Sequence, residues 1–155
     1  MSAWLEVFGR LHPFVLHLPV GLLIGIGVLE GVAVFRRGQG APRLLVAFTA
    51  LSAVLAAGTG WVLHEEPDYS GSTLLWHERL GIAVAVCSML CLLLHWRGHT
   101  MAYRGMLVVT LTVLMPAGHF GASMSHGAGF LTEPLRQREA APAAPDVVPP
   151  VTPPA

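Results

Sequence analysis

Residues 13–35 read PFVLHLPVGLLIGIGVLEGVAVF, an apolar run in which Glu30 is the only Asp, Glu, Lys or Arg. A helix needs about 20 mostly apolar residues to cross the hydrocarbon core of a bilayer. Three further runs of this kind follow, at about Leu44–Leu63, Leu74–Trp96 and Met101–Phe120. Because no water reaches that core, each run must be helical to pair its own backbone groups. The sequence therefore predicts four transmembrane helices.

The connections between these runs are short, at Arg36–Arg43, His64–Thr73 and Arg97–Thr100. Short connections make consecutive helices antiparallel neighbours. We therefore expect an all-α integral membrane protein, folded as an up-down-up-down four-helix bundle. Pro19 lies inside the first run, where it is expected to kink the helix or loosen its first turn.

Three parts of the chain differ in composition. The four-helix transmembrane domain should cover residues 12–135, and the proline- and alanine-rich residues 136–155 predict a disordered tail. Residues 1–11 carry three apolar side chains at helical spacing, Trp4, Phe8 and Leu11. This N-terminal segment is compatible with a short amphipathic helix in the membrane interface, and equally with a frayed terminus.

The overall composition supports a bilayer as the main partner. Of the 155 residues, 54% are hydrophobic and 12% are charged, whereas soluble domains carry about 25% charged residues. The formal net charge is zero and no basic stripe is present, which argues against a nucleic-acid partner. Cys87 and Cys91 lie inside an apolar run, where small packing residues are expected. No Cys-x-x-Cys-His motif is present, so covalent c-type haem attachment is not expected.

Arginine, the only strong base in the chain, is distributed unevenly between the two ends of the predicted bundle. Close to the helices, the N-terminal end carries Arg10 and Arg79. The opposite end carries Arg36, Arg37, Arg43, Arg97 and Arg104. The positive-inside rule places that opposite end in the cytoplasm, so both termini should face the periplasm or the cell exterior. Glu30 is costly at membrane depth and is expected to pair with an arginine such as Arg36 or Arg97.

Histidines gather at the N-terminal end of the predicted bundle. Six of the eight are expected there, and the other two, His95 and His99, at the opposite end. The six are His12, His17, His64, His77, His119 and His126. An unpaired polar ring in hydrocarbon costs free energy, and neutral imidazole is a common ligand of metals and of haem iron. The pattern predicts a haem or metal site near one membrane face.

Haem needs two axial ligands from different helices, and His17, His77 and His119 are the best-placed candidates. His12, His126 and His64 are further candidates for binding the cofactor, although a solvated loop position would also explain His64. Six histidines allow one haem b or two, and the sequence leaves their pairing open. A copper or zinc site is the alternative cofactor. Its predicted ligands are His17, His77, His119 and His126.

Several segments carry a resemblance to a known pattern. They are LHPFVLHLP at 11–19, HERLGI at 77–82, GHFG at 118–121, SHG at 125–127 and FLTEP at 130–134. Over roughly residues 11–135 the chain resembles an uncharacterised bacterial four-helix membrane domain of unknown function. Members of that family occur N-terminal to c-type cytochrome domains or beside Rieske-type proteins. The residues that match the family pattern are His12, His17, His77, His119 and His126.

The resemblance implies redox work in the bacterial inner (cytoplasmic) membrane, with both termini periplasmic. In this chain a proline-rich tail stands where the family has a cytochrome domain, so a separate periplasmic c-type cytochrome or other redox protein is the implied partner. The leading hypothesis is a membrane b-type haem subunit that transfers electrons between such carriers, or from quinol to a carrier. The alternatives are a copper- or zinc-binding module and a structural anchor of a larger redox complex. A stand-alone enzyme is the weakest case, since no His-Glu-x-x-His, nucleophile elbow or phosphate loop is present.

Overall fold

The computed structural model describes residues 3–64, 71–127, 129, 132–134 and 136, and in these ranges the chain is helical without strands. The tail expected at residues 136–155 lies outside the described residues, apart from Arg136. The helices are α1 (Ala3–Arg10), α2 (His12–Val15), α3 (His17–Arg36), α4 (Arg43–His64), α5 (Ser72–Trp96) and α6 (Thr100–His126). The all-α fold class is therefore confirmed.

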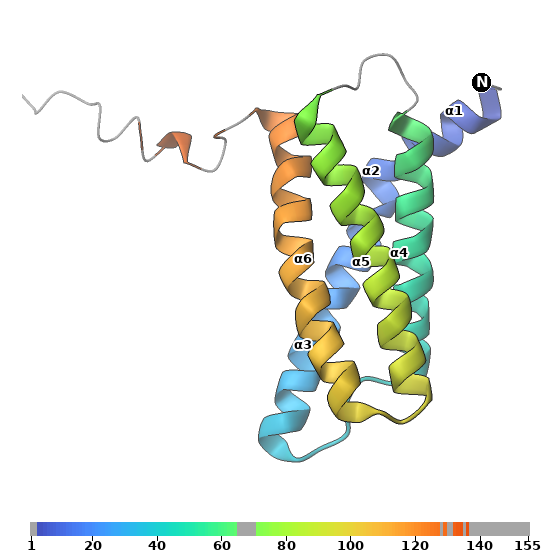
Figure 1. Ribbon diagram of the computed structural model, residues 1–155, viewed down its shortest axis with the longest axis vertical. Coiled ribbons are helices and arrows are strands. Elements are labelled where there is room, and N and C mark those ends of the chain that lie inside the picture. Colours follow the sequence, from blue (N-terminus) through green and yellow to red (C-terminus); the bar gives the residue numbers. More distant parts are fainter. Residues whose placement is uncertain (1–2, 65–70, 128, 130–131, 135, 137–155) are drawn as a thin grey trace, which may run out of the picture.

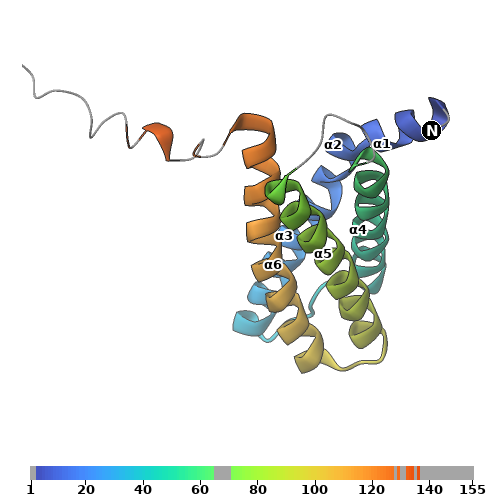
Figure 2. The same ribbon diagram turned by 45° about the horizontal axis from the view of Figure 1, so that its top comes forward.

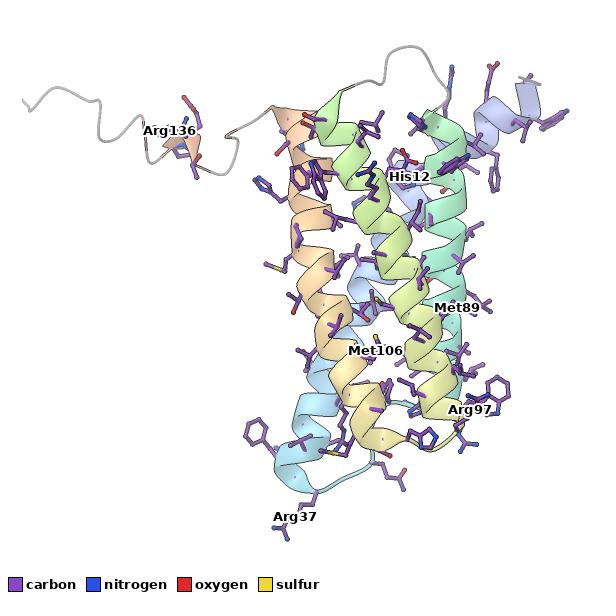
Figure 3. The ribbon with its side chains drawn as sticks, in the orientation of Figure 1. His12, Arg37, Met89, Arg97, Met106 and Arg136 are labelled. Carbon is purple, nitrogen blue, oxygen red and sulfur yellow. The ribbon has the colours of Figure 1, made fainter. Side chains whose placement is uncertain are left out.

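Helices α3 to α6 form an antiparallel bundle, with α1 and α2 at the end where the chain begins (Figure 1). The closest packing is between α5 and α6, followed by α4 against α5, whereas α3 and α6 touch over a smaller area. Arg37 and Arg97 lie at the opposite end of the bundle from His12 (Figure 3). Four helical stretches are long and apolar enough to cross a membrane. The chain is thus a multi-pass membrane protein with the predicted four-helix architecture.

The first transmembrane run differs from the prediction in its start and continuity. It begins at Ala3 and is interrupted at Leu11 and at Leu16, which separate α1, α2 and α3. Pro13 occupies the first turn of α2, where its missing N–H costs little. Pro19 has no N–H to offer the carbonyl of Val15. Leu16, between α2 and α3, nevertheless keeps helical backbone angles, and its N–H bonds to the carbonyl of His12.

The last helix is longer than predicted, ending at His126 instead of near Phe120. Pro116 is accommodated inside α6. Ser123 and Ser125 donate their hydroxyls to the carbonyls of His119 and Gly121, so these residues stay compatible with a helix. The helix stops at Gly127, whose φ of 91° lies in a region that favours glycine.

The outward surface of the bundle is apolar, as lipid requires. Val28, Leu51 and Val108 are each about 60% exposed. The interior mixes aliphatic side chains with hydroxyls that are at most 5% exposed, namely Thr49, Ser52, Thr59, Ser88 and Thr110. Each hydroxyl donates to a carbonyl of its own helix. These five hydroxyls are therefore satisfied within their own helices. The hydroxyl of Tyr103, which is 1% exposed, has no hydrogen-bond partner among the residues that the structure describes.

A buried ion pair joins α3 to α6 at the end of the bundle opposite His12, where the arginines gather. Glu30, 5% exposed, accepts a 2.9 Å bond from Nε of Arg104 and a 2.8 Å bond from the backbone N–H of Ala41. Gly40 leaves room for the carboxylate, since a Cβ there would overlap it. The expectation that Glu30 pairs with an arginine is confirmed, but the partner is Arg104, not Arg36 or Arg97. Closure of the bundle brings the first turns of α6 against α3.

We predict that Glu30→Ala lowers the free energy of unfolding by about 2–4 kcal/mol, because it leaves a guanidinium and a buried N–H without partners. Thermal unfolding in detergent, followed by helical circular dichroism, measures the change. Glu30→Gln keeps an acceptor for Ala41 and should lose less, and Arg36→Ala, exposed at the same end, should lose little. Equal stability of Glu30→Ala and the parent protein would contradict this account of the closure.

Candidate histidine-pair site

The structure brings two of the six candidate histidines together inside the bundle. The imidazole rings of His12, from α2, and His77, from α5, have centres 6.1 Å apart and planes at 74°. Both side chains are half-buried near the end where the chain begins, and His12 is labelled there in Figure 3. The two rings come from the first and third transmembrane runs, which are far apart in sequence.

His12 is anchored to helix α4. Its Nδ1 lies 2.9 Å from the carbonyl oxygen of Ala56 and 3.3 Å from Oγ1 of Thr59. A carbonyl can only accept, so Nδ1 carries the proton and donates it. Gly60 permits the close approach, since a Cβ there would lie 2.9 Å from Cε1 of the ring. In the neutral ring, Nε2 is then the atom with a free lone pair.

His77 is anchored to helix α6 in the same way. Its Nδ1 donates to the carbonyl of Ala117 at 2.9 Å, and a Cβ on Gly121 would lie 2.9 Å from its Cε1. In both cases the accepting carbonyl comes four residues before the glycine, so α4 and α6 each present an Ala-x-x-x-Gly seat to one imidazole. The two helical hairpins of the bundle therefore repeat one local design. The repeat fixes both rings as Nδ1–H tautomers with Nε2 available.

Two cavities adjoin the histidine pair, with volumes of about 70 and 100 Å³. The first is lined toward the end of the bundle by Trp61, His64, Glu78 and Met124, among others. The second continues deeper, past Leu16, Pro19, Val84 and Leu114. Both cavities are lined by His12, His77, Ala57 and Gly81. Small residues on α4 and α5 thus leave room on either side of the paired rings.

The other four candidates lie outside the pair. His64 lines the first cavity and places Nδ1 3.7 Å from a carboxylate oxygen of Glu78. Nδ1 of His17 lies 2.6 Å from the carbonyl of Pro13, four residues back, and this ring is exposed. His119 and His126 are also exposed, on the last turns of α6.

Sequence reasoning gave His17 and His119 precedence over His12, and it expected a kink at Pro19 to aim His17 into the bundle. The structure instead brings His12, on the short helix α2, to the carbonyl of Ala56 on α4. A usable signal was present in the sequence. Gly60 and Gly121 each follow an alanine by four residues near the end of a transmembrane run.

A site built from three or more metal-binding side chains is not found in the described part of the chain. No group of three His, Cys, Asp or Glu residues there is close enough to hold an ion. What the pair offers is two imidazoles from different helices, with ring centres 6.1 Å apart and planes at 74°. A metal ion bound by both Nε2 atoms would lie about 2 Å from each.

Fold and site together define a multi-pass four-helix membrane protein with an anchored histidine pair near one face. No family model, curated protein or solved structure matches the chain. The resemblance to the four-helix domain found with cytochromes therefore stays a prediction.

We predict that Gly60→Ala and Gly121→Ala each destabilise the protein by about 1–3 kcal/mol, because the added methyl group displaces an imidazole held by a hydrogen bond. Gly58→Ala and Gly118→Ala are matched controls on the same two helices, and a Cβ at either position meets no atom within 4 Å. The controls should be neutral or stabilising by up to about 1 kcal/mol. Thermal unfolding in detergent compares the four. If the two pairs of variants behave alike, the rings are not held against these glycines.

Proposed function

We propose that the protein is a membrane b-type haem protein and serves as an electron-transfer subunit, in which His12 and His77 would hold the iron of one haem. The observation that carries the proposal is the pair itself, two anchored imidazoles from different helices with ring centres 6.1 Å apart. Backbone carbonyls hold both Nδ1–H groups, the outer-shell support that histidine ligands of metals almost always have.

The residues around the pair are mostly small or apolar, and the cavities of about 70 and 100 Å³ would have to widen to admit a haem. Ala57 and Gly81 lie at the junction of the two cavities and present little bulk. Leu16, Val84 and Leu114 supply apolar walls on the inner side. Haem would supply one-electron chemistry between ferric and ferrous iron, while the chain sets ligand basicity, dielectric and solvent access.

The distribution of arginines supports a periplasmic location for the site. The end opposite His12 carries Arg37 and Arg97 (Figure 3), which the positive-inside rule assigns to the cytoplasm. In the bacterial inner membrane both termini would then be periplasmic. The partners that fit are a periplasmic c-type cytochrome or another redox protein, with quinol in the bilayer as a further electron donor.

We predict that protein from haem-sufficient cells shows a reduced-minus-oxidised Soret and α-band spectrum and about one haem per chain in a pyridine hemochrome assay. His12→Ala or His77→Ala should abolish the low-spin spectrum, and added imidazole should restore it. His17→Ala and His119→Ala, which remove exposed histidines, should leave it unchanged. A colourless preparation, or a spectrum that depends on the exposed histidines instead, would overturn the assignment.

A bare copper(I) ion is the second candidate, favoured by two observations. The cavities beside the pair are small for a macrocycle, since drug-sized ligands occupy pockets of about 300–1,000 Å³. Met124 also lines the first cavity, together with His12 and His77, and thioether and imidazole are both ligands of copper. Elemental analysis separates the candidates, since stoichiometric copper without iron would support copper. Zinc usually binds three or four His, Cys, Asp or Glu side chains. The described residues contain no group of three such side chains, so a zinc site stays a prediction.

A further inference from the structure

The short N-terminal helix α1 carries an apolar stripe that no part of the described bundle covers. Trp4, Val7, Phe8 and Leu11 follow the i, i+3, i+4, i+7 spacing of one helix face. They are 84%, 54%, 38% and 46% exposed, respectively. Leu11 keeps helical backbone angles, and its N–H bonds to the carbonyl of Val7, so it continues the face beyond Arg10.

The opposite side of α1 is the side that packs on the bundle. Gly9 is buried, and a Cβ there would lie 3.0 Å from the backbone nitrogen of Leu63. At 100° per residue, Gly9 points about 150° away from the centre of the apolar stripe. Glu6 and Arg10 form a third, charged flank, four residues apart. The helix therefore has one face packed on α4, a charged flank, and an apolar face that no residue described in the structure covers.

The length of the first helical stretch leaves α1 beyond what one span needs. Residues Ala3–Arg36 form a helical stretch of 34 residues, about 50 Å if fully helical, whereas the hydrocarbon core is about 30 Å thick. The 20 residues of α3 alone match that thickness. In both ribbon views α1 projects outward at an angle from the end of the bundle (Figures 1 and 2).

The uncovered stripe is also continuous with the lipid-facing surface of the bundle. Phe14, 82% exposed, and Leu18, 43% exposed, extend the apolar surface from α1 toward the outside of α3. Tryptophan at the edge of a membrane protein favours the headgroup level. These observations select lipid as the occupant of the stripe.

We propose that α1 is an interfacial anchor that lies in the lipid headgroup layer on the histidine side of the membrane. Its stripe of Trp4, Val7, Phe8 and Leu11 enters the acyl boundary, and the charged flank with half-buried Glu6 and exposed Arg10 lies away from it. Because α1 ends two residues before His12 and packs on the last turn of α4 through Gly9, the lipid surface also holds α2 in place. This inference does not depend on which cofactor the histidine pair binds.

Site-directed spin labelling of the full chain tests the anchor. In a Cys87→Ser/Cys91→Ser background, Trp4→Cys, Val7→Cys and Phe8→Cys place nitroxides on the stripe, and Glu6→Cys places one on the charged flank. The protein is reconstituted in vesicles of phosphatidylcholine and phosphatidylglycerol. Labels on the stripe should collide preferentially with oxygen, which concentrates in lipid, and the label at position 6 with a water-soluble nickel chelate.

Two results would overturn the proposal. Equal collision with the nickel chelate at all four positions would place α1 in water, and shielding of the stripe from both reagents would place it under protein, such as a second copy. A second measurement avoids the cysteine background. In vesicles with brominated acyl chains, Trp4→Phe should remove a fluorescence component that shallow bromines quench more than deep ones. Absence of such a component would also count against the anchor.

Discussion

Two hydrogen bonds between helices, from His12 to the carbonyl of Ala56 and from His77 to that of Ala117, determine the arrangement of the histidine end. A ring N–H in a medium of low dielectric must find an acceptor, because leaving it unpaired costs as much as the bond is worth. Helical carbonyls keep a second lone pair after their own i+4 bond. A neighbouring side chain reaches that lone pair only where the helix surface is flat, and Gly60 and Gly121 make it flat.

The opposite end obeys the same constraint with a charged group. Glu30 is buried near the end of α3, and it is matched by one guanidinium and one backbone N–H. Between the two ends, buried hydroxyls bond to carbonyls of their own helices. The stronger polar contacts between helices therefore lie at the ends. In the middle, Sγ of Cys91 on α5 lies 3.6 Å from Oγ1 of Thr110 on α6. The buried residues of these two helices include the small Ala85, Ser88 and Ala117.

Hydropathy predicts the four spans because the thickness of a bilayer fixes the length of an apolar helix. The topology follows from the short connections, and the end that gathers the histidines follows from the topology. The pairing of His12 with His77 does not follow, because it depends on which carbonyl of a neighbouring helix each ring reaches, and the sequence does not show how the helices are rotated against one another. The partner of Glu30 was missed for a related reason, since the sequence does not show which arginine the closing helix turns inward.

The repeated Ala-x-x-x-Gly seat argues that the pair acts as a unit. Packing alone would not require each ring to be held by its neighbouring helix in the same way. Both rings nevertheless donate from Nδ1 to a backbone carbonyl and lie against a glycine four residues after that carbonyl. The surroundings of the two rings differ in one contact, since Thr59 lies near the His12 ring alone. Both rings line the cavity that is also lined by His64 and Glu78. Equivalent anchoring leaves two equivalent Nε2 atoms, as a ligand shared between two helices requires. A group bound there would be accessible from one side of the membrane, because the remaining length of the bundle separates it from the other side.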